Sequence, residues 1–123
     1  MKWLREFDNK LYTKLNSNLN PKTILRNKKI IIQNVLNYFF KSTRNDNLPN
    51  DPVSRFHLGN GAVLEKINFL GNSTPKSLNE SLGIMANYLY DLNNVEKNHE
   101  KYVIDKKINA SKPLLKDFSK INK

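Results

Sequence analysis

The feature that most constrains this chain is a repeated signal for the start of a helix. A short polar residue directly followed by proline occurs at Asn20-Pro21, Asp51-Pro52 and Thr74-Pro75, and Ser111 followed by Pro113 gives a looser fourth start. The polar side chain can accept a free backbone N–H, and proline suits the first helical position, where no N–H needs a partner. These signals divide the 123 residues into several helices, within one small domain or part of a larger one.

Apolar residues at helical spacing complete this pattern. Near the N-terminus they form one stripe, which breaks before Asn20. A capping-box spacing at Asn93 and Glu96 predicts a further helix start. The helices expected are within residues 1–20, over Lys22–Lys41, from Asp51-Pro52 to Gly59-Asn60-Gly61, from Thr74-Pro75, from Asn93, and from Ser111 to Ile121.

Two segments have the alternation of a strand, Ala62–Phe69 and Ile84–Tyr90. In the second, Tyr88 and Tyr90 share one face with Ile84 and Ala86. The chain is therefore expected to have an α/β fold that is rich in helices and has two or more short strands. Two strands alone make a marginal sheet, so both are expected to pair with strands that this chain does not contain. In isolation we expect exposed strand edges and a tendency either to self-associate, as a homo-oligomer, or to misfold.

Composition excludes several classes of site. The chain contains no cysteine, which rules out disulfides, thiolate zinc sites and a cysteine nucleophile. Apolar runs such as Ile30–Ile32 are far too short to cross a bilayer, and Met1–Glu6 has no apolar segment of the signal-peptide type. These features predict a cytoplasmic protein with no membrane partner.

The net charge of +10 has two readings. One is an anionic partner, which would be a nucleic acid, an acidic membrane or a phosphorylated ligand. The other is a composition that is rich in Lys and Asn along the whole chain. The basic residues are scattered, and the longest basic runs are the pairs Lys28-Lys29 and Lys106-Lys107. No recognised nucleic-acid motif is present, so a small basic nucleic-acid-binding module is the disfavoured alternative.

The most specific stretch is Asp51–Tyr90, which reads DPVSRFHLGNGAVLEKINFLGNSTPKSLNESLGIMANYLY. It resembles the C-terminal hallmark of malonyl-CoA decarboxylases, most densely in DPVSRFHLGNGA and GIMANYLYDL. The resemblance is best over residues 22–115, and it identifies residues 1–123 as a single partial domain, the C-terminal part of the catalytic region.

The resemblance implies a reaction and a fold. The reaction is the decarboxylation of malonyl-CoA to acetyl-CoA and carbon dioxide. The fold is the closing part of a GNAT acyltransferase-like domain, which a helical domain precedes in the family. It implies no metal, biotin or other prosthetic group, so no cofactor is expected.

Two residues carry the implied chemistry. Decarboxylation leaves an enolate, which needs a donor and then a proton on carbon. Histidine titrates near neutral pH, and the family gives this acid role to the histidine of its FHL-NGA motif, which is His57 here. Tyr90 matches the second tyrosine of the NY-Y strand that lines the acyl pocket, where its phenol could bind the substrate. The alternative is a half-buried strand tyrosine without that role. His57 and Tyr90 are therefore candidates for contact with the substrate.

Other residues in the motif have plainer expected roles. Asn60 is expected to serve the turn after His57, and Asn87 and Tyr88 are expected to be structural. His99 lies in a polar helix and is expected to be solvated.

The resemblance also shows what the chain lacks. In the family the catalytic serine, the loop that cradles the CoA pyrophosphate and a glutamate near the pocket lie upstream. None of Ser42, Ser54, Ser73, Ser77 and Ser81 has the context of that serine. We therefore expect the chain to need the missing N-terminal part as a partner and to be inactive alone. The alternative is a non-catalytic remnant of such an enzyme.

The chain also departs from the family pattern within the matched stretch. It has Phe69-Leu70-Gly71-Asn72 where the family has Trp-(Leu/Met)-Ala-Asp, so an acidic residue is replaced by an amide. Ser77 replaces a family glycine.

Overall fold

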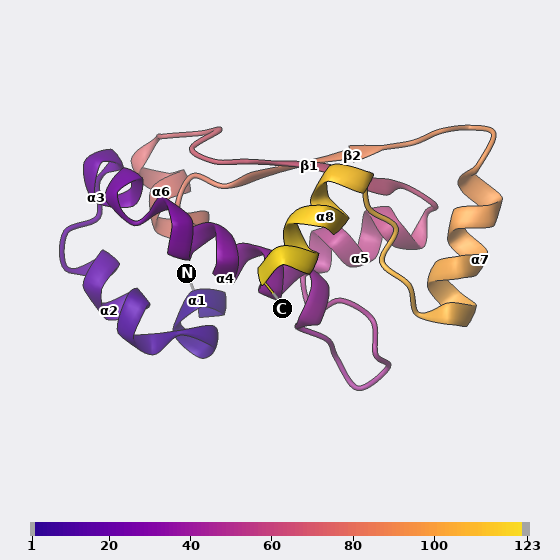
Figure 1. Ribbon diagram of the computed structural model, residues 1–123, viewed down its shortest axis with the longest axis horizontal. Coiled ribbons are helices and arrows are strands. Elements are labelled where there is room, and N and C mark those ends of the chain that lie inside the picture. The colour runs from indigo at the N-terminus through magenta and orange to yellow at the C-terminus, as the bar shows by residue number, and fades with distance from the viewer. Residues whose placement is uncertain (1, 122–123) are drawn as a thin grey trace. The chain divides into compact units, whose positions relative to one another are not determined.

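The computed structural model of the protein describes residues 2–121 and contains short helices and one small sheet (Figure 1). The two strands pair with each other in an antiparallel sheet. The expected helix-rich α/β fold is therefore confirmed. Within the described residues the elements are α1 (Lys2–Phe7), α2 (Asn9–Asn16), α3 (Pro21–Arg26), α4 (Lys28–Lys41), α5 (Pro52–Gly59), β1 (Val63–Asn68), α6 (Pro75–Ser81), β2 (Met85–Leu89), α7 (Val95–Asp105) and α8 (Lys112–Ile121).

The chain divides into two compact units. Unit 1 contains the residues up to Val35 together with Ile67–Met85, and unit 2 contains Leu36–Lys66 together with the residues from Ala86 onward. The elements α4, β1 and β2 contribute residues to both units. Met1, Asn122 and Lys123, which the predicted domain 1–123 includes, lie outside the described residues.

Unit 1 is built around the apolar stripe expected near the N-terminus. Leu4, Leu11 and Leu15 are buried, and Asp8 starts α2 by accepting a hydrogen bond from the N–H of Leu11 at 3.0 Å. Asn20 caps α3 as expected, with its side-chain oxygen 3.0 Å from the N–H of Thr23. The local cap signals are thus confirmed in this unit.

The expected single helix over Lys22–Lys41 is wrong, because the chain breaks at Asn27 between α3 and α4. The side-chain amide of Asn27 donates to the carbonyl of Thr23 at 2.8 Å. Asparagine competes in this way with the backbone for helical hydrogen bonds, and its own carbonyl accepts from the N–H of Ile31 to begin α4.

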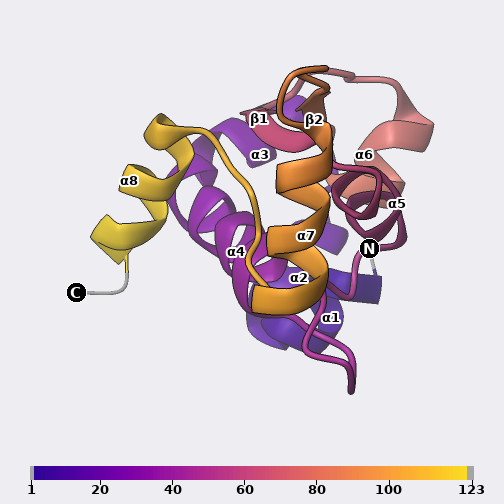
Figure 2. The same cartoon turned by 90° about the vertical axis from the view of Figure 1, so that its right-hand side faces the viewer.

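Unit 2 contains α5, α7 and α8. Helix α7 packs against α5 (Figure 2). The ring of Tyr102 in α7 is buried, and a Cβ on Gly59 of α5 would lie 3.7 Å from it. Phe118 of α8 stacks on Phe40 at 4.7 Å between ring centroids. The cap of α8 is Ser111, whose hydroxyl accepts from the N–H of Leu114 at 3.4 Å, as the sequence predicted.

The start of α7 differs from expectation. The cap residue is Asn94 and not Asn93, and its side chain makes no capping bond to the helix. Asp91 organises the turn instead. One carboxylate oxygen of Asp91 accepts from the N–H of Asn93 at 3.1 Å and the other from the amide of Asn94 at 2.7 Å.

One edge of β1 is covered, contrary to the expectation that the strand edges are exposed. Residues 109–111 run beside it with a parallel bridge between Leu64 and Ala110. The N–H of Leu64 donates to the carbonyl of Asn109 at 2.8 Å, and the N–H of Ser111 donates to the carbonyl of Leu64 at 2.9 Å. This part of β1 therefore has backbone partners on both sides.

No helix in the described part of the chain is both long and apolar enough to pass through a bilayer.

Candidate active site

Helix α5 carries His57, and its first turn is fixed by its cap. A carboxylate oxygen of Asp51 accepts from the N–H of Ser54 at 2.9 Å, and Pro52 occupies the first turn. The phenol of Tyr38 donates to the other oxygen of Asp51 at 3.1 Å. Both carboxylate oxygens of Asp51 therefore have a hydrogen-bond partner.

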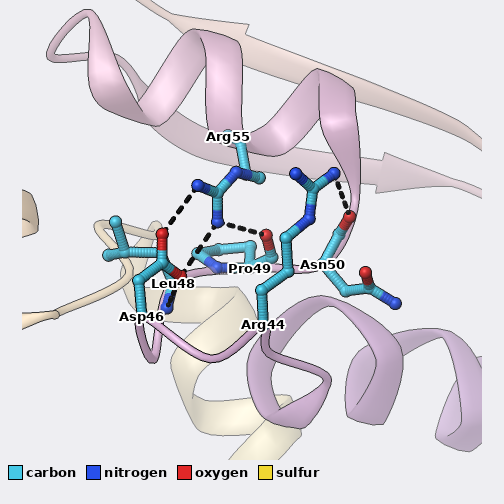
Figure 3. A network of polar contacts seen from close by, with 6 residues as sticks. All are labelled: Arg44, Asp46, Leu48, Pro49, Asn50 and Arg55. Atoms are coloured by element: carbon cyan, nitrogen blue, oxygen red, sulfur yellow. Dashed lines mark hydrogen bonds and ion pairs between the residues drawn. The ribbon is translucent and has the colours of Figure 1, made fainter.

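The loop before α5 is tied to the helix by Arg55 (Figure 3). Its guanidinium makes two bonds to the carboxylate of Asp46, at 2.7 and 3.1 Å, and a third to the carbonyl of Pro49 at 3.3 Å. Arg55 and then the N–H of Leu48 hold the pKa of Asp46 well below its usual value of 3.8. The bidentate pair lies at the surface, so its contribution to stability is modest.

The end of α5 is a turn that requires glycine. Gly61 has a φ of +87°, and a Cβ there would lie 2.3 Å from the carbonyl oxygen of Val95. Asn60 ends the helix through its backbone, with its N–H bonded to the carbonyls of Phe56 and His57. The expected end of the helix at residues 59–61 and the turn role of Asn60 are thus confirmed.

Two buried asparagines connect this turn to the rest of unit 2. The amide of Asn98 donates to the carbonyl of Gly61 at 3.2 Å, and the amide of Asn109 donates to the backbone carbonyl of Asn98 at 3.0 Å. Asn109 in turn accepts from the N–H of Leu64 in β1. This chain of bonds joins the end of α5, the middle of α7 and the start of β1.

The structure brings His57 and Tyr90 together. Nδ1 of His57 lies 2.6 Å from the phenol oxygen of Tyr90 just after β2. The imidazole also stacks on the ring of Tyr88, with centroids 4.5 Å apart and planes 22° apart. The rings of Phe56 and His57 are arranged in a T shape, with their centroids 5.1 Å apart. Within the described residues Nε2 of His57 makes no hydrogen bond.

Ser54 and Tyr88 form a second polar pair beside the first. Their hydroxyl oxygens lie 2.6 Å apart, and Ser54 is only 1% exposed. Burial raises the pKa of Tyr88 to about 12, although the bond from Ser54 acts in the opposite direction. Tyr88 is therefore a neutral phenol throughout the range in which proteins work.

His99 also lies near the end of α5. Its Nδ1 is 2.6 Å from the carbonyl oxygen of Gly59. Because a carbonyl can only accept, Nδ1 of His99 carries the proton in this contact. The ring is exposed as expected, but it has a structural partner that the sequence did not predict.

The surroundings of His57 suit acid–base chemistry. Among residues 2–121, no three or more His, Asp or Glu side chains are grouped as metal ligands. The imidazole instead has one nitrogen held by a phenol and one face covered by a ring. Such a histidine can transfer a proton through a nitrogen of fixed direction.

Comparison with known families gives the lineage of this site. The family described as "Malonyl-CoA decarboxylase C-terminal domain" matches residues 2–123. The chain belongs to the malonyl-CoA decarboxylase family. The resemblance noted in Asp51–Tyr90 is thereby confirmed.

Individual decarboxylases agree with this assignment. The mitochondrial malonyl-CoA decarboxylase of Anser anser anser is 42% identical over 65 residues, which are 53% of this chain and 13% of the goose protein. The corresponding protein of Rattus norvegicus is 43% identical with the same coverage. The chain thus spans about an eighth of these curated relatives.

Solved structures of the family show the same fold over most of the chain. The crystal structure of malonyl-CoA decarboxylase from Rhodopseudomonas palustris has a TM-score of 0.72 and is 42% identical, covering 77% of this chain and 22% of that one. The Cupriavidus metallidurans decarboxylase has a TM-score of 0.70 at 25% identity, covering 94% of this chain and 31% of that one.

The departures from the decarboxylase pattern have local explanations in unit 1. A methyl group on Gly71 would lie 2.9 Å from Cγ of Met85, so Met85 occupies the space that the family alanine would need. The side-chain oxygen of Asn72 accepts from the N–H of Thr74 at 3.0 Å, a bond that an aspartate could also accept. Ser77 is buried in α6, and its N–H donates to the cap residue Thr74.

The pairing of Ser54 with Tyr88 beside His57 was not predicted from the sequence. Two periodicities could have indicated it. Ser54 and His57 are three apart on one helix face, and Tyr88 and Tyr90 are two apart on one strand face. Nothing local, however, indicates that these two faces meet in this decarboxylase domain.

Proposed function

We propose that this chain is the C-terminal part of an enzyme that decarboxylates malonyl-CoA to acetyl-CoA and carbon dioxide. The observation that carries the proposal is the bond between His57 and Tyr90 within a chain of the malonyl-CoA decarboxylase family. The relatives named malonyl-CoA decarboxylase support the choice of substrate.

His57 is the proposed proton donor. When the bond to the carboxylate breaks, carbon dioxide leaves and its electron pair moves into the thioester as an enolate. The thioester itself delocalises this charge, so the proposed step uses no prosthetic group. Protonation at carbon completes acetyl-CoA, and His57 recovers its proton from solvent.

Tyr90 is proposed to select the tautomer of His57. An imidazole nitrogen accepts a hydrogen bond better than a phenol oxygen, so the phenol donates to Nδ1. The proton of the neutral ring then lies on Nε2, which is the nitrogen that faces the substrate. Tyr90 is 40% exposed, so it can also contact the acyl group.

The proposed partner is the upstream part of the enzyme. The chain spans 22–31% of two solved relatives, and the remaining length would supply the serine and the CoA-binding loop. The complete catalytic domain is proposed to be GNAT-like. A cytoplasmic location stays a prediction, since the animal relatives are named mitochondrial.

The test is the release of carbon dioxide from malonyl-CoA. It is measured for the chain alone and with the upstream segment of a related decarboxylase added. We expect turnover only in the mixture, and His57→Gln should lower it by about 10²–10⁴-fold.

His99→Gln is the matched control, because it removes the other histidine near α5 and should leave turnover close to that of the unmodified chain. Turnover that survives His57→Gln would refute the role of His57. A mixture that folds together yet never turns over would identify the chain as a remnant.

A further inference from the structure

Tyr88 contacts both His57 and Ser54. Its ring covers one face of the imidazole at 4.5 Å, and its hydroxyl lies 2.6 Å from that of Ser54. Helix α5 thus supplies both the imidazole on which Tyr88 stacks and the hydroxyl that bonds to Tyr88.

The spacing of residues along α5 and along the strand β2 explains why two side-chain pairs form between them. Residues three apart on a helix are separated by about 4.5 Å along its axis, and alternate residues on a strand by about 6.6 Å. Tyrosine is long enough to bridge this small mismatch. Ser54 therefore meets Tyr88 while His57 meets Tyr90.

We propose that Tyr88, anchored by Ser54, is a positioning residue that fixes the plane of the His57 imidazole so that Tyr90 bonds to Nδ1. The link to catalysis rests on the proposed function. The positioning itself is a property of this chain and needs no substrate.

The imidazole needs such a support. The last torsion of a histidine side chain has a broad energy profile, so the ring plane is not set by the backbone of α5. A hydrogen bond to Nδ1 alone leaves the ring free to swing about the bond. A stacked ring removes that freedom, provided the stacked ring is itself fixed.

Ser54 provides that fixation. Its hydroxyl is buried, and a buried hydroxyl without a partner is costly, so both groups favour keeping the bond. Because burial keeps the phenol of Tyr88 protonated, the hydrogen bond to Ser54 persists at neutral pH.

The test is the nitrogen-15 NMR spectrum of the histidine rings in this chain, which reports the tautomer of each ring. We expect the Nε2–H tautomer to dominate at His57. Tyr88→Leu removes the stack and should lower the ratio of the two tautomers roughly fivefold, the equivalent of one ordinary hydrogen bond.

Two further variants separate the effect of the hydrogen bond between Ser54 and Tyr88 from the effect of the stacking of Tyr88 on His57. Tyr88→Phe keeps the stack and loses the bond to Ser54, and Ser54→Ala loses the same bond from the other side. Each should shift the tautomer ratio in the same direction as Tyr88→Leu but less. The double variant should shift it no further than one single variant, because both remove one shared bond.

Tyr38→Phe is the matched control. It removes a phenol bond to α5, at Asp51, without touching the imidazole, and should leave the ratio unchanged. Backbone amide spectra show whether each variant is folded. If Tyr88→Leu does not fold, the tautomer ratios of Tyr88→Phe and Ser54→Ala test the proposal.

An unchanged tautomer ratio in the folded variants would overturn the proposal, as would an equal shift in Tyr38→Phe. Failure of the decarboxylase assignment would appear separately, as absence of turnover with the tautomer shifts intact.

Discussion

The phenol oxygen of Tyr90 lies 2.6 Å from Nδ1 of His57, although the two residues are 33 positions apart in the chain. The bond joins the last turn of α5 to the residue that follows β2. It depends on the turn that ends α5 and on the face of the strand that Tyr90 shares with Tyr88. Changes at each of these places have predictable effects.

Tyr90→Phe should lower turnover of the assembled enzyme by about tenfold, because one hydrogen bond of about 1.4 kcal/mol to the acid is lost while the ring remains. The measurement is carbon dioxide release at saturating malonyl-CoA. Tyr12→Phe, which removes a hydroxyl in unit 1, serves as control. Equal turnover in both variants would mean that the phenol has no part in the reaction.

Gly61→Ala should destabilise the protein by about 2 kcal/mol or more, because alanine is strained at a positive φ and its Cβ would meet backbone of α7. Gly59→Ala is the matched control. Its Cβ would meet Cε1 of Tyr102 at an ordinary 3.7 Å, so it should be neutral or stabilise by about 0.5–1 kcal/mol. Urea unfolding of both variants measures the difference, and a Gly61→Ala protein as stable as Gly59→Ala would contradict the geometry.

Local signals in the sequence predicted much of this architecture. The caps at Asn20, Asp51, Thr74 and Ser111 are confirmed, because each depends on backbone groups within three residues of the cap. Alternation also placed both strands to within two residues at each end. Such signals contain the information that a short element needs.

Apart from the break at Asn27, which is local, the interactions that the sequence did not predict join distant parts of the chain. Asn98 and Asn109 look like ordinary polar residues, and only the course of the backbone places carbonyl groups within their reach. Helix α3 ends at Asn27 because the side-chain amide of Asn27, in place of a backbone N–H, donates to the carbonyl of Thr23. The spacing of apolar residues does not indicate such a bond. At the site, the family resemblance predicted His57 and Tyr90. The part played by Ser54 became clear only from its hydrogen bond to Tyr88 of β2.

Asn109→Ala should cost about 1–3 kcal/mol of stability, since it removes a buried amide and leaves the carbonyl of Asn98 without that donor. Asn98→Ala should cost a similar amount. Because both belong to one network, the double variant should cost less than the sum. Thermal and urea unfolding test this, with the exposed Asn93→Ala expected within about 0.5 kcal/mol of the unmodified protein. Strict additivity would show that the two amides act independently.

Asp46→Asn should lower stability slightly at neutral pH and not at all in acid. The pKa of Asp46 is depressed by Arg55, so the folded state favours the ionised carboxylate. The contribution is therefore fully present above the usual pKa of 3.8 and is lost as pH falls below it. Urea unfolding at several pH values should show the difference between variant and unmodified protein vanish in acid, and added salt should shrink it. Asp117→Asn is the control. A difference in stability between Asp46→Asn and the unmodified protein that persists at low pH would exclude the ion pair as its cause.

Self-association should involve the exposed apolar residues at the end of β2. Leu92 is 89% exposed and Leu89 is 47% exposed, and a fully buried leucine contributes about 1.5–3 kcal/mol to an interface. Leu89→Glu with Leu92→Glu should therefore weaken association by at least about tenfold, since tenfold corresponds to 1.4 kcal/mol. Sedimentation velocity over a range of concentrations measures this. Val103→Glu with Ile104→Glu is the matched control, because it changes two exposed apolar residues of α7. A chain that sediments as a monomer at every concentration, or that responds equally to both pairs of changes, would show that the end of β2 is not the surface that associates.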